Sequence, residues 1–429
     1  MNSKTLAKDL IKFIDASPCA FFAVKAMEEE LHKSDYKELK EEDKWDLSLG
    51  GKYFVKKNDS AILAFELPNT KKDLAFKIIA SHSDSPCFRV KPEPDIYQNG
   101  YHKLNTEVYG GAILHTWFDR ALSLAGRVYT KNKKDALHPK MHLINIDKDL
   151  MSIVSLCIHQ NREVNKGFDI NAQKDTLPIL ELINDTMEKL KLEDIIAKEL
   201  KVSREDILDF DLFLYDREGG KIVGLNDEFV QVGRLDNLAM AHLSYKSLIA
   251  NKASKAINLI YVSDNEEVGS MTKQGANSPF LKNVMRRIIL ALGLDDEEFY
   301  RVKAKSFMIS SDLAHAYHPN YPEKCDITNM PKMGEGVCIK YAANQSYTSD
   351  AESASVFKQF AENAGAKVQA FLNRSDVRGG STIGPISSTQ LDIKSVDIGN
   401  PILGMHSVRE FGSVEDHYNL YKIFTEFFK

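Results

Sequence analysis

The sequence has 429 residues, of which 43% are hydrophobic and 27% charged, and its formal net charge is −5. This length indicates two domains, or one large domain with an insertion, and it supplies a large core without disulfides. The net negative charge argues against a nucleic-acid-binding face, and no apolar run approaches the roughly 18 residues of a membrane helix. The polar N-terminus carries no signal-peptide segment, and the five cysteines are scattered, with no C-x-x-C pair. Both features favour the reducing cytoplasm and argue against a thiolate zinc site.

The first part of the chain is typical of helices followed by strands. Residues 1–50 are expected to be helical, with one helix at Ala20–Leu31. Apolar runs then predict strands at Tyr53–Lys56, Ala61–Leu67 and Asp73–Ala80. His82 and Asp84 follow the last strand directly. A carboxylate beside a histidine can fix the tautomer of a metal ligand, although a surface turn explains this pair equally well when it is considered alone.

The character of the sequence changes after Lys91-Pro92. Short strands and turns are expected at Tyr101–Tyr109, Ala112–Trp117 and Gly126–Tyr129, and a helical stretch follows near Met187–Leu200. This segment contains several histidines but no cluster of histidine with carboxylates. We therefore expect residues 93–220 to form a second domain inserted into the first, which comprises residues 1–92 and 221–429.

The first domain resumes near Phe229. Asp236 falls at the start of a helical pattern, where an aspartate is often only an N-cap. Ile257–Val262 is an apolar run typical of a strand buried on both faces, and Glu266 and Glu267 follow it, with Gly269 where the backbone turns. Adjacent carboxylates repel unless a cation lies between them, so they favour a metal site over a solvated turn only if other ligands are near.

The last third of the chain adds further candidates. Asp312 follows a strand at Ser306–Ser310. His315 and His318 are spaced as one helical turn, but we interpret them as structural because a turn-rich loop follows. A capping box at Ser349 and Glu352 predicts a helix that ends at Gly365. The glycine-rich loop around Gly380 either offers N–H groups to an anion or is only a turn, and Met405 and His406 precede a final helix at Glu415–Phe428.

The alternation of strands and helices predicts an α/β three-layer sandwich with a mostly parallel central sheet. Sites in such folds form at the carboxyl ends of the strands, where five candidates fall, with Asp236 nearby: His82, Glu266, Glu267, Asp312 and His406. Two histidines, two aspartates and a glutamate can hold two divalent metals that share a carboxylate, and a further carboxylate can act as general base. This chemistry suits amide hydrolysis. Phosphoester hydrolysis competes but favours extra Arg and Lys near the site.

The chain resembles the aspartyl aminopeptidases, a family of binuclear zinc aminopeptidases. The matching stretches span nearly the whole chain and include SHSDSPCFRVKP (81–92), GRLDNLA (233–239), DNEEVGS (264–270), SSDLAHAYHPNY (310–321), GGSTIGPI (379–386) and GMHSVRE (404–410). The resemblance implies His82 and His406 as terminal ligands and Asp236 as the bridge. It implies that Glu267 and Asp312 complete the two ligand sets, with Glu266 as general base and Asp84 orienting His82.

The resemblance also implies an assembly and a substrate. In this family the inserted β-rich domain makes dimers that form a tetrahedral dodecamer, and the counterpart of His159 reaches into the partner's active site. Lys340 and Tyr347 match substrate-contacting positions, and we add Gly380 and Met405 to the expected substrate-binding set. Lys340 favours peptides that begin with Asp or Glu. Ligation by nitrogen and oxygen suits Zn²⁺, while Co²⁺ or Mn²⁺ could occupy the looser site.

Three other functions compete with this interpretation. A member of the same family can prefer neutral or apolar first residues. A binuclear deacylase or carboxypeptidase would use the same catalytic core without recognising a free amine. A non-catalytic assembly protein could retain the fold, but the intact DNEEVGS stretch argues against it because a scaffold has no need of a base beside a ligand.

Overall fold

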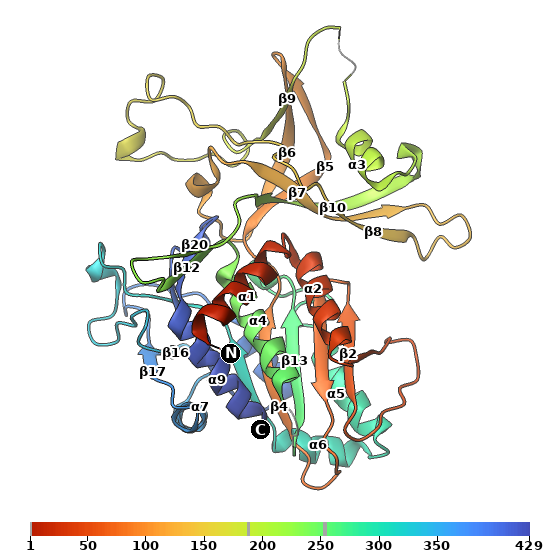
Figure 1. The fold of residues 1–429 in the computed structure, drawn as a ribbon, viewed down its shortest axis with the longest axis vertical. Coiled ribbons are helices and arrows are strands. Elements are labelled where there is room, and N and C mark those ends of the chain that lie inside the picture. Colours follow the sequence, from red (N-terminus) through yellow and green to blue (C-terminus); the bar gives the residue numbers. More distant parts are fainter. Residues whose placement is uncertain (1, 187–188, 252–254) are drawn as a thin grey trace. The chain divides into compact units, whose positions relative to one another are not determined.

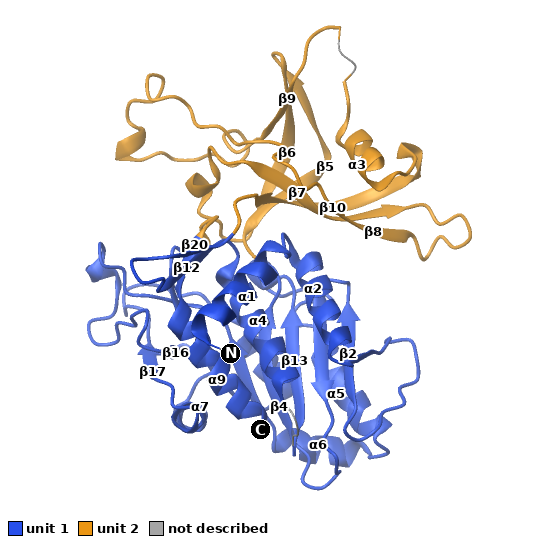
Figure 2. Ribbon diagram, viewed as in Figure 1, with its two compact units in different colours: residues 1–84, 220–405, 410–429 blue, residues 85–219, 406–409 orange. Residues whose placement is uncertain are grey.

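The chain folds into two units in the computed structural model, which describes residues 2–186, 189–251 and 255–429 (Figures 1 and 2). Unit 1 comprises residues 1–84, 220–405 and 410–429, and unit 2 comprises residues 85–219 and 406–409. The sequence predicted an insertion at 93–220. The roles of the units as catalytic and dimerisation domains stay predictions.

A nine-stranded sheet is the centre of unit 1, in the order β1-β2-β3-β13-β4-β14-β18-β16-β17. The four strands β13, β4, β14 and β18 run parallel, whereas the β2–β3, β3–β13 and β16–β18 ladders are antiparallel. The strands are β1 (Lys37–Glu38), β2 (Lys52–Lys57), β3 (Ala61–Glu66), β4 (Phe76–His82), β13 (Ile257–Ser263), β14 (Phe307–Ser311), β16 (Val337–Lys340), β17 (Val368–Phe371) and β18 (Lys394–Gly399).

Helices cover both faces of this sheet. One layer contains α1 (Ser3–Asp15), α2 (Ala20–Lys33), α4 (Leu235–Ala250), α7 (Ala351–Asn363) and α9 (Val414–Phe428). The opposite layer contains α5 (Phe280–Ala291), α6 (Asp296–Ala304) and α8 (Ile383–Leu391). In Figure 1, α4 lies in front of the central strands.

Alternation along the central strands explains this layering. Ile79 and Ile260 pack in the core beneath α4 and α9, while Ile78 and Leu259 pack in the core beneath α5 and α6. Successive side chains of a strand point to opposite faces, so an uninterrupted apolar run needs a helix layer on each side. The predicted three-layer α/β sandwich is therefore confirmed.

A smaller five-stranded sheet completes unit 1, in the order β11-β12-β20-β19-β15. Its strands are β11 (Lys221–Val223), β12 (Phe229–Val232), β15 (Ala314–His315), β19 (Pro401–Leu403) and β20 (Glu410–Ser413). Short 3-10 turns lie at η4 (Glu266–Val268) and η5 (Pro322–Lys324). Among the described residues, no helix has the length and apolar character needed to cross a membrane.

Unit 2 is built on a six-stranded antiparallel sheet in the order β8-β7-β10-β5-β6-β9. Its elements are β5 (Cys87–Gln98), β6 (Tyr101–Tyr109), η1 (Leu114–Trp117), β7 (Leu122–Thr130), β8 (Lys140–Asn145), η2 (Val164–Lys166), β9 (Ile179–Leu182), α3 (Leu192–Leu200), η3 (Arg204–Asp206) and β10 (Ile207–Asp216). One face of the sheet packs its own apolar core against α3. The fold is therefore rich in β structure, as predicted.

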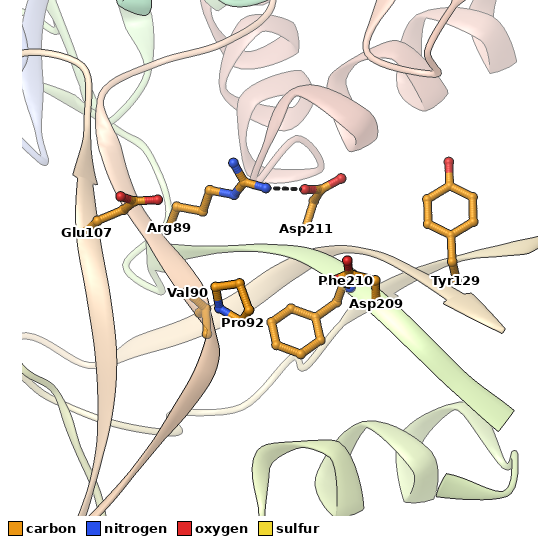
Figure 3. A pocket seen from close by; sticks show the side chains of 8 residues that line it. All are labelled: Arg89, Val90, Pro92, Glu107, Tyr129, Asp209, Phe210 and Asp211. Atoms are coloured by element: carbon orange, nitrogen blue, oxygen red, sulfur yellow. Dashed lines mark hydrogen bonds and ion pairs between the residues drawn. The ribbon is translucent and has the colours of Figure 1, made fainter. Parts of the chain in front are cut away.

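Strands β5 and β10 of unit 2 pair only at Arg89–Phe213 and Phe88–Leu214 and then separate. The separation leaves a cavity of about 330 Å³ in which Arg89 and Asp211 form an ion pair of 2.5 Å (Figure 3). None of the residues that line this cavity belongs to the predicted site: Arg89, Val90, Pro92, Glu107, Tyr129, Asp209, Phe210 and Asp211.

Several local predictions were wrong. Asp350, not Ser349, is the N-cap of α7, and it forms the capping box with Ser353. Ala112–Trp117, expected among the short strands and turns, is a turn and not a strand, because it contains the 3-10 turn η1. His315 ends the two-residue strand β15 and His318 lies in a loop, so they share no helical turn. The helix expected near Met187 begins at Leu192, and residues 187–188 lie outside the described part of the chain.

Candidate metal centre

Three parallel strands of unit 1 end side by side and place the acidic residues together. Ser263 at the end of β13 is in register with His82 at the end of β4, and β14 ends beside them at Ser311. The chain then turns into the loops that carry the candidates predicted from the sequence. The structure brings together His82, Asp84, Asp236, Glu266, Glu267 and Asp312, all of unit 1.

His82 is the centre of this cluster. Its side chain is 1% exposed, and its Nε2 lies 3.5 Å from Asp236 Oδ1, 3.6 Å from Asp312 Oδ1 and 3.9 Å from Glu266 Oε2. Potential ligand atoms of His82, Asp236 and Asp312 lie within 4.8 Å of one another, as do those of Asp236 and Glu267. Asp236 is thus near both sets of donors, which is the position that a bridging carboxylate needs.

Asp84 contacts both His82 and the turn that carries Glu266 and Glu267. Its Oδ1 lies 3.2 Å from His82 Nδ1, which favours the hydrogen on Nδ1 and directs Nε2 toward the carboxylates. Its two oxygens accept hydrogen bonds of 3.1 Å from the backbone N–H groups of Glu266 and Glu267. The sequence predicted the first contact but not the second.

The turn after β13 has the backbone that its sequence suggests. Asn265 has φ +59° and Gly269 has φ +95°, both in the left-handed region that asparagine and glycine tolerate best. The side-chain oxygen of Asn265 accepts hydrogen bonds from Thr272 and Gln274 and thereby fixes the turn. Glu266 and Glu267 consequently project from a rigid 3-10 segment.

Asp236 is not the helix cap that its sequence position suggested. Arg234 is the N-cap of α4 with φ +60°, and Asp236 and Asn237 have non-helical dihedral angles joined by a cis peptide bond. The Asp236 N–H donates to Glu410 Oε2 at 2.9 Å, and Asn237 Nδ2 donates to the Ser311 carbonyl at 2.9 Å. Glu410 and Asn237 are positioning residues that sequence reasoning missed, although both lie in stretches that carry the family resemblance.

The electrostatics of the cluster favour a bound cation. Burial raises the pKa of Glu266 to about 8, and burial together with Asp236 raises the pKa of Glu267 well above its usual value. Burial lowers the pKa of His82, but Asp236, Asp312 and Asp84 outweigh it and hold the pKa well above normal. A cation reverses this preference for protonation. Imidazole and carboxylate donors at this spacing suit Zn²⁺ or another borderline metal, so these residues fit the predicted group.

Lys340 lies beside this cluster. Its side chain is buried, its Nζ is 3.4 Å from Asp312 Oδ2, and it lies 5.4 Å from the centre of the Tyr347 ring. Two residues predicted to bind substrate are therefore neighbours, one of which contacts a candidate ligand. Gly380 is exposed, and Met405 packs against the core of unit 1.

Two predicted residues belong to unit 2. His406 begins the segment 406–409, where its Nδ1 hydrogen-bonds the Gly111 carbonyl at 3.1 Å. This bond puts the hydrogen on Nδ1 and makes Nε2 the nitrogen that can bind a metal. His159 lies in an exposed stretch in which Val154, Leu156 and Ile158 are each about half exposed.

Comparison with known proteins agrees with this chemistry. A family model described as "Aminopeptidase I zinc metalloprotease (M18)" matches residues 13–428. A probable M18 family aminopeptidase 2 of Clostridium novyi (strain NT) is 54% identical over 430 residues, which cover 100% of this chain and 99% of that protein.

Solved structures match the whole fold. A chain of the Ape4 and Nbr1 complex is 34% identical with a TM-score of 0.95, and the match covers 99% of this chain and 86% of that chain. A chain of the S. cerevisiae mApe1 dodecamer is 27% identical with a TM-score of 0.85, covering 98% of this chain and 96% of that chain.

Proposed function

The chain belongs to the M18 family of zinc metallo-aminopeptidases, hydrolases that act on the N-terminal residues of peptides, and we propose that it removes N-terminal Asp or Glu with two divalent metal ions. The observation that carries this proposal is the crowding of one buried histidine and four carboxylates at the ends of three parallel strands. Carboxylates this close repel one another when no cation is present, and bound cations make the same arrangement favourable.

The proposed ligands form two sets that share Asp236. His82 and Asp312 would hold one ion with it, and Glu267 and His406 would hold the other. The bound ions would polarise the scissile carbonyl and lower the pKa of an attacking water. Asp84 would keep the His82 tautomer and the glutamate turn in place.

Glu266 is the proposed general base. Its side chain is 16% exposed, more than those of Asp236 and Asp312, and its Oε2 lies 3.9 Å from His82 Nε2. A base that is partly open to solvent can take a proton from water and hand it to the leaving amine.

The proposed preference for acidic first residues rests on Lys340, a buried cation next to Tyr347. A substrate carboxylate in a partly desolvated pocket needs such a partner. The contact of Lys340 with Asp312 favours a second candidate, an aminopeptidase for neutral or apolar first residues, because this carboxylate already neutralises the lysine.

Assembly is part of the proposal. The solved mApe1 relative is a dodecamer, and unit 2 of this chain exposes the apolar side chains of Val154, Leu156 and Ile158 around His159. Exposed apolar stretches of this kind are typical of interaction surfaces. We infer a homodimer through unit 2 that assembles into a tetrahedral dodecamer, with His159 acting in the partner's active site. Among the described residues no disulfide joins the five cysteines, which suits a cytoplasmic enzyme.

A substrate panel tests the function. Purified protein is stripped with a chelator and reloaded with Zn²⁺, Co²⁺ or Mn²⁺, and peptides that begin with Asp, Glu, Leu or Ala are compared. We expect activity only after reloading, two ions per chain, and the highest kcat/KM for Asp or Glu. Equal or better hydrolysis of Leu peptides would select the second candidate. Hydrolysis of N-acetylated peptides as fast as free ones would refute an aminopeptidase.

A further inference from the structure

Asp397 is a buried carboxylate that the proposed chemistry does not use. It lies in β18, and its side chain is fully buried. Its Oδ2 accepts a hydrogen bond of 2.6 Å from the Thr348 backbone N–H, and its Oδ1 accepts one of 2.7 Å from Thr382 Oγ1. One carboxylate thus contacts two parts of the chain, which we name the Tyr347 segment (residues 346–349) and the Gly380 segment (residues 379–382).

Further bonds join the same parts. The Ser349 hydroxyl accepts from the Asp397 N–H at 2.9 Å and donates to its carbonyl at 3.2 Å. The Thr348 and Ser395 hydroxyls are 2.6 Å apart. The two segments also contact each other, because Ser381 Oγ donates to the Ser346 carbonyl at 3.1 Å. Strand β18 and both segments therefore form one polar network.

The network depends on the two oxygens of a carboxyl group held close to the backbone. Burial raises the pKa of Asp397, while the Thr348 N–H, the Thr382 hydroxyl and nearby Lys340 oppose this. A Cβ added at Gly384 would lie 2.4 Å from Asp397 Oδ2, so a glycine is required where α8 begins over the carboxylate. Removing one partner of a buried hydrogen bond leaves the other without a partner, which is costly.

We propose that Asp397 is a positioning residue for substrate binding, because it fixes the Tyr347 and Gly380 segments to the central sheet and to each other. Each segment carries one of the expected substrate contacts, and the Tyr347 ring lies beside Lys340. This inference rests on the proposed aminopeptidase function. Asp397 would thus shape the substrate-binding side of the site without contacting the substrate.

Two variants weaken the network from different sides. Asp397→Asn keeps the shape but replaces one of the two acceptor oxygens with an amide group. Thr382→Val removes the donor to Oδ1, and Thr382→Ser is its conservative match. Ser306→Ala is the stability control, because the buried Ser306 hydroxyl accepts from the Phe76 N–H at 2.8 Å at the opposite, amino-terminal end of β14.

Hydrogen exchange tests the positioning without any substrate. We expect the Thr348 amide to exchange at least about tenfold faster in Asp397→Asn than in wild type, with no such change in Ser306→Ala. Unchanged exchange at residues 346–349 and 379–382 in both Asp397→Asn and Thr382→Val would overturn the inference. If Asp397→Asn does not fold, Thr382→Val against Thr382→Ser decides.

Kinetics tests the link to substrate. We expect KM for the preferred peptide to rise at least about fivefold in Asp397→Asn and Thr382→Val, with kcat within about twofold, unchanged metal content and Thr382→Ser close to wild type. An unchanged KM with a Tm lowered as in Ser306→Ala would show a purely structural role and overturn the inference. Loss of metal would also overturn it. If wild type hydrolyses no peptide, the proposed function fails and hydrogen exchange alone decides whether Asp397 fixes the segments.

Discussion

Asp84→Asn is the substitution that best separates positioning from ligation in the metal centre. Asp84 accepts hydrogen bonds from the N–H groups of Glu266 and Glu267 at 3.1 Å each, and its Oδ1 lies 3.2 Å from His82 Nδ1. An asparagine has nearly the same shape but only one acceptor oxygen. In one orientation its amide group faces the Glu267 N–H, and in the other it faces both the Glu266 N–H and the imidazole N–H.

The number of hydrogen bonds that Asp84→Asn loses sets the expected loss of zinc affinity. A lost hydrogen bond to a charged acceptor costs about 1.5–3 kcal/mol, which is roughly 10- to 100-fold in an equilibrium constant. Mutating a residue that hydrogen-bonds a metal ligand typically lowers metal affinity or activity by a similar 10- to 100-fold. We expect Asp84→Asn to bind zinc about 10- to 100-fold more weakly, measured by competition with a chelator of known affinity.

A matched control exists in unit 2. Asp135 Oδ2 contacts His138 Nδ1 at 2.6 Å in an exposed turn, so Asp135→Asn removes the same kind of carboxylate–imidazole contact away from any predicted ligand. We expect this control to retain zinc affinity and kcat/KM within about twofold. Zinc affinity of Asp84→Asn equal to that of the control would refute the assignment of Asp84 as a positioning residue.

Four further outcomes are expected. Glu266→Gln should lower kcat by about 10²- to 10⁴-fold with metal content near wild type, whereas Glu267→Ala should lose metal; the reverse pattern in metal analysis would exchange their roles. Lys340→Met should reduce kcat/KM for Asp and Glu peptides roughly a hundredfold more than for Leu peptides, and equal losses would exclude it from specificity. His159→Phe should reduce turnover on the order of a hundredfold yet bind metal, and subunit exchange with Glu266→Gln should restore activity; a mixture that exchanges but stays inactive would exclude action in trans. The fully buried His102 contacts Asp95 at 2.7 Å and Glu181 at 3.1 Å. Burial lowers the pKa of His102, but Asp95 and Glu181 outweigh burial and raise it. The protonated imidazole therefore stabilises the fold below about pH 6.5, and this stabilisation is lost as pH rises through the folded-state pKa. The difference in free energy of unfolding between wild type and His102→Gln, measured with urea, should therefore shrink as pH rises; a constant difference would contradict the charged assignment.

The strands that carry the centre could be predicted because their signal is local. The apolar run Ile257–Val262 appears as β13 with one further residue, and the run ending at Ala80 is β4. Strands buried on both faces need only a continuous apolar stretch between polar turns. The carboxyl ends of such strands lie at one edge of a parallel sheet, so His82 and the two glutamates could be expected together.

The remaining features depend on partners distant in sequence. Asp236 resembles a helix cap in its own neighbourhood, and its non-helical conformation is stabilised by Glu410, 174 residues later. Asp397 lies in a largely buried strand and has no motif of its own, so its partners Thr348 and Thr382 emerge only from the fold. The cap of α7 was misplaced by one residue because Ser349, Asp350 and Ser353 all suit capping, and tertiary contacts of Ser349 with β18 decide among them.

The interrupted path of the chain through unit 1 has a consequence for synthesis on the ribosome. The first 84 residues supply β2, β3 and β4, but β13 and β14 pair with them only after residues 257 and 307, and α9 joins α1 and α4 within the last sixteen residues. Residues 85–219 are contiguous and emerge earlier. A nascent chain therefore carries unpaired apolar strands until β14 has emerged, and His82 and Asp312 of the proposed metal centre cannot meet before then.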